Sequence, residues 1–254
     1  MSRLEQGTHT GYHGGVKYEL QTIPVWDAYE QQADCPLCYL ERKLEADYQR
    51  FFLGSAVMAP DMRVEVNRIG FCGRHFGLLE RGANRLGLAL MTQTHLADRT
   101  RRFEKARRPA ERAAGSAKTR KTRAELDALL EALAEEERSC MICDRLAADL
   151  ANYTFTIVRL HRADENFAET FRSSHGFCLP HMRMTIEIAR EVLRARELPY
   201  WLSDLFATQD AAVGSLTEGL EEMVARYDYR STEPATDSIR AALPRAISKI
   251  VGRR

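Results

Sequence analysis

The sequence contains no long hydrophobic run. No stretch of its 254 residues approaches the roughly 18 apolar residues that a membrane-spanning helix needs. The first residues, 1–17, are polar and rich in Gly and His, and they lack the apolar segment of a secretory signal peptide. These absences predict a protein that stays in the cytoplasm and has no membrane partner.

The sequence also has no excess of charge of either sign. Its 37 Lys and Arg residues balance 36 Asp and Glu residues, which leaves a formal net charge of +1. A protein-wide field that attracts nucleic acid or a membrane is therefore excluded, and such a role would need a local patch. With 44% hydrophobic and 29% charged residues, the composition is that of an ordinary globular protein.

Several enzyme motifs are missing as well. The sequence has no phosphate-binding loop, no HExxH zinc-protease motif, no nucleophile elbow and no dinucleotide-binding fingerprint. An enzyme with a pocket between two halves of the chain stays an alternative, but no motif supports it.

Cysteine is scarce, and all six cysteines fall into two copies of one pattern. Cys35-Pro-Leu-Cys38 is followed by Gly70-Phe-Cys-Gly-Arg-His75, and Cys140-Met-Ile-Cys143 is followed by Gly176-Phe-Cys-Leu-Pro-His181. Both copies read CxxC and then GFCxxH. In a reducing compartment such cysteines indicate metal or redox chemistry rather than disulfides.

The repeated pattern predicts one Cys3His metal site in each half. A CxxC pair offers two sulfurs to one ion, and a CxxH pair adds a third sulfur and an imidazole, the donor set of many structural zinc sites. We expect two zinc ions, one per half, with the ligands Cys35, Cys38, Cys72 and His75 in the first and Cys140, Cys143, Cys178 and His181 in the second. Four protein ligands leave no open position, so no catalytic residue is assigned.

Other interpretations of the same residues remain open. One is an iron–sulfur centre with one histidine, and another is a metal-free redox CxxC. His175 could replace His181 or hydrogen-bond behind it, whereas His95 lies on an apolar helix face and fits a core or surface position without a ligand role. The negative charge of the sites could be offset by Arg42, Lys43, Arg74, Arg145 and Arg183.

Apolar residues recur at helical spacing along nearly the whole chain, as at Leu37, Leu40, Leu44 and Tyr48. This predicts an all-α, internally duplicated fold in which each half is organised around its own metal site. Only residues 16–23 are expected to be extended. The predicted segments are a polar N-terminus (1–24), a first half (25–98), a basic linker or helix extension (99–123), a second half (124–230) and a basic C-terminal helix and tail (231–254).

The segment between the halves is segregated in charge. Residues 99–123 hold eleven Lys or Arg and two Glu, a net charge of +9 (11 − 2), and residues 125–137 hold six acidic residues. We expect a solvated helix and flexible linker, interrupted at Pro109 and at Gly115-Ser116. A nucleic-acid patch is the alternative, but Phe103 is the only aromatic residue in the run, which favours a protein partner.

The phrases IPVWDAYE, DCPLCYLERKLE, EVNRIGFCGRHF and NRLGLALMTQTHL resemble an uncharacterised bacterial protein family, a domain of unknown function with the duplicated CxxC and GFCxxH motifs. The resemblance covers nearly the whole chain. It implies a bacterial cytoplasmic protein that uses the eight Cys and His residues above, and it brings no established activity.

Among functions, the residues favour a non-enzymatic, zinc-stabilised scaffold or adaptor that binds a macromolecule. A thiol-based redox or zinc sensor is the first alternative.

Overall fold

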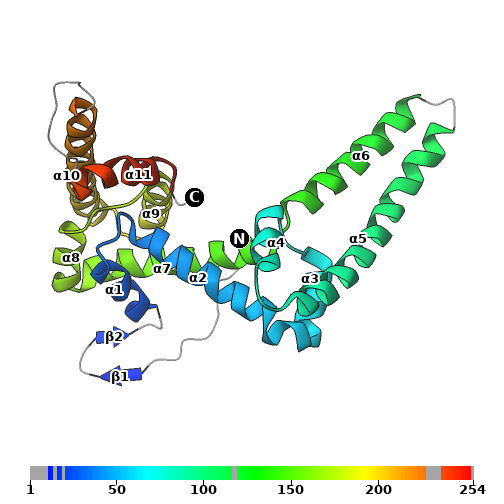
Figure 1. The fold of residues 1–254 in the computed structure, drawn as a ribbon, viewed down its shortest axis with the longest axis horizontal. Helices are drawn as coiled ribbons and strands as arrows, with labels where there is room; N and C mark the ends of the chain where they lie inside the picture. Colours follow the sequence, from blue (N-terminus) through cyan, green and yellow to red (C-terminus); the bar gives the residue numbers. More distant parts are fainter. Residues whose placement is uncertain (1–10, 14–15, 19–20, 116–118, 227–235, 253–254) are drawn as a thin grey trace. The chain divides into compact units, whose positions relative to one another are not determined.

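The computed structural model describes residues 11–13, 16–18, 21–115, 119–226 and 236–252 (Figure 1). Apart from one short β-hairpin and the turns between helices, these residues are helical, so the all-α prediction is confirmed. In chain order the elements are β1 (Gly11–His13), β2 (Val16–Tyr18), α1 (Thr22–Glu30), α2 (Pro36–Leu53), η1 (Ser55–Met58), α3 (Pro60–Ile69), α4 (Gly73–Glu80), α5 (Arg85–Ala114), α6 (Thr119–Arg138), α7 (Met141–Ala163), α8 (Glu165–Arg172), α9 (Leu179–Val192), α10 (Leu198–Ala225) and α11 (Asp237–Val251).

The extended segment expected at residues 16–23 is shorter than predicted. β2 pairs with β1 in antiparallel fashion and ends at Tyr18, and α1 already begins at Thr22. Pro24 therefore lies in the first turn of a helix, where its missing N–H would have no partner within the helix anyway. None of the helices in the described ranges combines the length and apolarity needed to cross a bilayer.

The chain folds as two compact units that do not coincide with the two sequence halves. One unit consists of residues 1–42 and 148–254, and the other of residues 43–147. We call them the terminal unit and the central unit. The terminal unit thus contains the CxxC of the first half, and the central unit contains the CxxC of the second half. Each unit mixes elements of both copies of the repeat.

Each unit has its own apolar core. In the terminal unit Phe167 is fully buried, and its ring lies edge-on to Trp26 and Tyr29, at centroid distances of 5.1 and 5.0 Å. In the central unit the buried rings of Phe52 and Phe71 pack edge to face at 5.0 Å. Leu37 and Leu40, two residues of the predicted apolar stripe, are buried in the terminal unit.

Within the described residues, the basic segment is mostly helix, which agrees with the helical part of the expectation, whereas Ser116 lies outside the described residues. α5 continues through Pro109 to Ala114, and α6 begins at Thr119. Figure 1 shows α5 and α6 side by side as a long helical hairpin. The C-terminal helix is present as α11, and its Ile239 and Ala242 are buried.

Candidate metal centres

All four ligand pairs lie at helix N-termini. Cys72 and Cys178 are the residues that precede the first turns of α4 and α9, both with extended backbone. Cys35 and Cys140 stand directly before α2 and α7, and their carbonyls accept the first helical hydrogen bonds, from Tyr39 and Asp144. The free N–H groups and the dipole of a helix N-terminus stabilise negative charge. Each ligand pair thus lies where the ionised form of its cysteine sulfur is favoured.

Cluster 1, in the terminal unit, joins Cys35, Cys38, Cys178 and His181. The Nδ1 atom of His181 lies 3.5, 3.4 and 3.2 Å from the sulfurs of Cys35, Cys38 and Cys178. The sulfurs of Cys38 and Cys178 are 3.6 Å apart. Cys38 is partly exposed, and the other three residues are buried.

Cluster 2, in the central unit, joins Cys72, His75, Cys140 and Cys143. The Nδ1 atom of His75 lies 3.2 Å from the sulfurs of Cys72 and Cys140 and 3.4 Å from that of Cys143. The sulfurs of Cys72 and Cys143 are 3.9 Å apart. This cluster is more open than cluster 1, because Cys143 is exposed and Cys72 is half-buried.

These distances match what one tetrahedral ion requires. With metal–sulfur and metal–nitrogen bonds typical of zinc, tetrahedral geometry puts two sulfurs about 3.8 Å apart and a sulfur and a nitrogen about 3.6 Å apart. The observed separations of 3.6–3.9 Å and 3.2–3.5 Å lie close to both values. They are far longer than the roughly 2.05 Å of a disulfide bond. In each cluster the four donor atoms lie within 4.8 Å of one another, so each cluster could hold a metal ion.

The predicted grouping of the ligands is wrong. Each CxxC pair meets the CxxH pair of the other half, so neither cluster belongs to one copy of the repeat. The length of the helices explains the exchange. α2 has 18 residues and spans about 27 Å, whereas the ten residues of α3 return over only about 15 Å. The first GFCxxH motif therefore meets the start of α7 within the central unit, while its own CxxC belongs to the terminal unit.

The glycine of each GFCxxH motif makes the turn that aims its cysteine at the cluster. Gly70 and Gly176 have φ angles of 72° and 65°, a conformation that L side chains rarely adopt. A Cβ atom at Gly70 would lie 2.4 Å from the ring of His95, and one at Gly176 would lie 2.6 Å from the side chain of Gln209. Both copies therefore need glycine for the backbone and for space.

A buried carboxylate stands behind the histidine of cluster 2. Glu45 of α2 is only 2% exposed, and its Oε1 atom accepts hydrogen bonds from His75 Nε2 at 3.2 Å and from Arg74 at 2.7 Å. Such a carboxylate fixes the ring orientation and raises the basicity of a metal-binding histidine. Arg74 was expected to offset the charge of the cluster, and in the structure its guanidinium group forms an ion pair with Glu45.

A buried lysine stands beside cluster 1 instead. Lys249 of α11 is 5% exposed, and its ammonium group donates hydrogen bonds to the backbone carbonyls of Asp34, at 3.1 Å, and His175. Arg245 of the same helix forms an ion pair with the Asp34 carboxylate at 2.6 Å. These contacts fasten α11 to the segments that carry Cys35 and Cys178.

Without an ion, cluster 1 does not hold three thiolates. Hydrogen bonds with Cys35 and Cys38 lower the pKa of the Cys178 thiol, whereas burial raises the pKa of Cys35 well above its usual value. Burial alone would lower the pKa of His181, but its hydrogen bonds to Cys178 and Cys38 outweigh that effect and raise the pKa to about 10. A divalent cation must therefore displace protons on binding, and acid must weaken its binding.

The same competition occurs in cluster 2. Burial opposes ionisation of Cys72, but hydrogen bonds from the His75 backbone and from Cys140 outweigh it, so the pKa of Cys72 is lowered. Burial and the neighbouring thiols raise the pKa of Cys143. Three closely spaced sulfurs ionise together only when a cation compensates their charge.

The eight clustered residues were predicted from the sequence, whereas Glu45 and Lys249 were not. Both are charged residues within apolar helix stripes: Glu45 lies seven residues before the buried Phe52, and Lys249 lies ten residues after the buried Ile239. That signal was available in the sequence. His175 lies outside cluster 1.

His95 is a core residue, which is one of the two placements that the sequence left open. It is 6% exposed, and its Nδ1 atom lies 2.9 Å from the carbonyl of Asn67. Its ring covers Gly70.

Replacing either motif glycine with alanine should destabilise its unit. We expect Gly70→Ala and Gly176→Ala to lower the free energy of unfolding by about 1–3 kcal/mol or more, because each adds a clash to an unfavourable φ. Gly214→Ala, in the interior of α10 with open space around its Cβ, is the matched control and should be neutral or stabilising by up to about 1 kcal/mol. Urea unfolding measures all three, and equal effects at Gly176 and Gly214 would contradict the account.

Glu45→Gln should weaken metal binding at cluster 2 alone. The amide removes the negative charge that supports His75, and loss of such a partner typically costs about 10- to 100-fold in metal affinity. Competition with a chromophoric chelator should then show one ion leaving more easily while the other behaves as in the unmodified protein. Glu80→Gln, at an exposed position of the same unit, is the control. If Glu45→Gln binds both ions with the affinity of the unmodified protein, Glu45 does not support metal binding by His75.

Comparison with protein families matches residues 16–254 to a family described as a family of unknown function, DUF6062. No curated protein and no solved structure matches the chain. The match covers nearly the whole sequence, as the resemblance in the motif phrases implied. The chain belongs to this family of unknown function.

Proposed function

We propose that the protein is a zinc-binding helical scaffold, in which two structural Cys3His zinc sites hold together a surface that binds another macromolecule. The observation that carries this proposal is the convergence of four protein donors at tetrahedral spacing in each cluster. A site closed by four protein ligands has no position left for a catalytic water. The eight residues Cys35, Cys38, Cys72, His75, Cys140, Cys143, Cys178 and His181 are the proposed ligands.

The size and chemistry of the clusters support zinc. Donor atoms that all lie within 4.8 Å of one another leave room for one ion rather than for a cluster of two or four irons. Three thiolates and one neutral imidazole are a common structural zinc set. When bound, zinc would supply charge neutralisation and a fixed tetrahedral link between the helix starts.

A structural role follows from what the clusters connect. In cluster 1 the contact between Cys35 and His181 links residues 146 positions apart, and in cluster 2 the contact between Cys72 and Cys143 links residues 71 positions apart. Binding an ion at such a link contributes directly to the free energy of folding, commonly on the order of 10 kcal/mol for structural zinc. The reduced thiols that this requires fit a cytoplasmic protein.

Elemental analysis of the purified chain should find two zinc ions per molecule. A strong chelator should remove them, release six reactive thiols and unfold or aggregate the protein, because the links between distant segments are lost. Circular dichroism and thermal melting measure that loss, and restored zinc should reverse it. A metal-free protein with an unchanged melting temperature would rule out the structural role.

A second candidate, a thiol-based redox or zinc sensor, is favoured by the openness of cluster 2. Cys143 is exposed, whereas three of the four ligands of cluster 1 are buried. Oxidants reach exposed thiolates first, and formation of a disulfide would remove two ligands from the ion. In this version cluster 2 responds to oxidation and cluster 1 keeps the terminal unit folded.

Limited peroxide treatment distinguishes the two candidates. The sensor predicts rapid release of one zinc equivalent, oxidation of Cys140 and Cys143 in peptide mapping, and recovery after addition of a thiol reductant and zinc. Cluster 1 in the same chain is the internal control and should keep its ion. Zinc retained in both clusters under conditions that oxidise a small-molecule thiol would favour the scaffold alone.

A further inference from the structure

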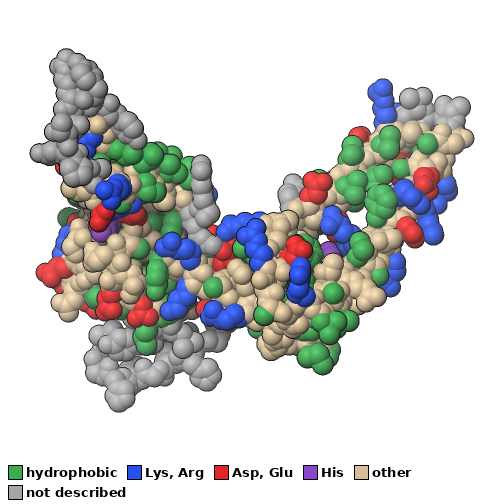
Figure 2. Space-filling view, viewed as in Figure 1, with side chains coloured by type: hydrophobic (Ala, Val, Ile, Leu, Met, Phe, Trp, Pro, Cys, Tyr) green, Lys and Arg blue, Asp and Glu red, His purple; other side chains and the backbone are tan. Residues whose placement is uncertain are grey.

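The hairpin of α5 and α6 leaves its apolar residues largely uncovered. We call residues 96–138 the arm. Leu126 and Leu130 of α6 are 45% and 62% exposed, and Phe103 of α5 is 38% exposed. Among the described residues of the arm, only Ala110 and Ala113 are buried. Figure 2 shows hydrophobic side chains along the arm, between basic and acidic ones.

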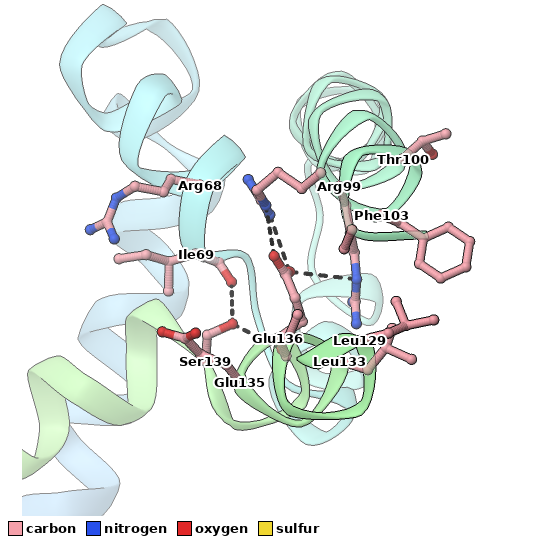
Figure 3. A pocket seen from close by; sticks show the side chains of 13 residues that line it. Arg68, Ile69, Arg99, Thr100, Phe103, Leu129, Leu133, Glu135, Glu136 and Ser139 are labelled. Atoms are coloured by element: carbon pink, nitrogen blue, oxygen red, sulfur yellow. Dashed lines mark hydrogen bonds and ion pairs between the residues drawn. The ribbon is translucent and has the colours of Figure 1, made fainter. Parts of the chain in front are cut away.

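These exposed residues lie on one face of the arm. Leu126, Leu130 and Leu133 are spaced at i, i+4 and i+7, so they form one stripe of α6. Phe103 and Leu133 line the same cavity of about 570 Å³ at the base of the arm, and Figure 3 shows their side chains on the same side of the two helices. The face is therefore continuous from α5 to α6. An amphipathic face of this kind normally packs against another element.

The two helices of the arm carry opposite charges. Residues 99–112 of α5 hold seven Lys or Arg and two Glu, a net of +5 (7 − 2), and residues 125–137 of α6 hold six acidic residues and no basic one. Ion pairs between the two helices, within the described part of the arm, run from Arg99 and Arg102 to the single acceptor Glu136. Within α5, Arg101 and Arg102 pair with Asp98, and Arg107 pairs with Glu111. Among the described residues, the acidic residues of α6 other than Glu136 form no ion pair, so the uncompensated charge of the arm is mainly negative and lies on α6.

Charged residues flank the apolar face on both helices. Arg107 is one turn beyond Phe103, lies over its ring at 5.8 Å and forms an ion pair with Glu111 of the same helix at 3.0 Å. An exposed pair within one helix is weak and can exchange for a partner on another chain. On α6, Glu137 continues the stripe of Leu126 and Leu130, and Asp127 lies next to it. Neither acidic residue forms an ion pair within the described residues.

The way α5 pairs with α6 puts these basic and acidic residues at similar heights along the arm. Arg102 bonds Glu136 near the base, and Thr122 bonds the carbonyl of Ala113 near the tip. Arg99 is therefore nearly level with Glu137, and Arg107 lies between the levels of Asp127 and Glu131. Rotation about a two-fold axis parallel to the arm leaves the height of each residue along the arm unchanged. It places α5 of one copy opposite α6 of the other.

We propose that the arm is a self-association surface, on which two copies of the chain pack face to face as a four-helix bundle. Leu126, Leu130 and Phe103 of each copy become the bundle core. Arg99 and Arg107 of one copy then face Glu137 and Asp127 of the other. The symmetric contact closes on itself and gives a dimer rather than a filament. Nucleic acid is a poorer partner for the arm, because the acidic residues of α6 beside the basic α5 would repel its phosphates.

The mass of the full-length, zinc-loaded chain in solution tests this directly. Sedimentation equilibrium from low to high micromolar concentration should give a dimer for the unmodified protein. The double variant Leu126→Glu and Leu130→Glu should weaken dimerisation by roughly 100-fold or more, because it puts four carboxylates in the bundle core. Leu86→Glu, which changes a 73% exposed leucine outside the arm, is the matched control and should dimerise normally.

A charge-reversal pair tests the arrangement of the helices. One chain carries Arg99→Glu with Arg107→Glu, and another carries Asp127→Arg with Glu137→Arg. Each alone should be monomeric, since like charges would meet, whereas an equimolar mixture should form a heterodimer. Circular dichroism checks that the arms remain helical. The proposal is overturned by a monomeric unmodified chain, by a double leucine variant that still dimerises, or by folded charge variants that fail to pair when mixed.

Discussion

The fold depends on one kind of contact: the convergence of two helix N-termini, each with two metal-binding side chains, on a single point. Cys35 and Cys38 at the start of α2 meet Cys178 and His181 at the start of α9, and the same geometry recurs where α4 meets α7. The segments joined are far apart in the sequence, so their association carries a large loss of chain entropy. A metal ion is well suited to offset that loss, because it replaces many weak contacts by four strong bonds.

The two clusters share their ligands but differ in their surroundings. Cluster 2 has a buried carboxylate, Glu45, between His75 and Arg74, whereas cluster 1 has a buried cation, Lys249, at its side. Three thiolates around a divalent ion leave a charge of about −1. Lys249 offsets that charge in cluster 1. In cluster 2 the opposite charges of Glu45 and Arg74 cancel each other, so the charge of about −1 remains. Together with the exposure of Cys143, this difference gives the proposed sensor function a definite location in the molecule.

The sequence was sufficient to find the helical fold and the clustered residues, because both depend on local spacing. Helical periodicity at Leu37 and Leu40, and the repeated CxxC and GFCxxH spacings, need no knowledge of distant contacts. The pairing of the motifs could not be found in this way. A CxxC pair completes the same donor set with either CxxH pair, and the choice between them depends on the lengths of the helices that separate the motifs, such as α2 and α3. Pro109 was similarly misjudged as an interruption, since the helix tolerates it within the arm.

Cysteine footprinting of a single variant can show whether the two halves exchange their ligand pairs. In zinc-loaded Cys72→Ser, brief alkylation followed by peptide mass spectrometry shows which thiols have lost their ion. We expect Cys140 and Cys143 to become reactive while Cys35, Cys38 and Cys178 stay protected. Reactive Cys35 and Cys38, with Cys140 and Cys143 protected, would show that each half binds its own ion and would contradict the structure described here.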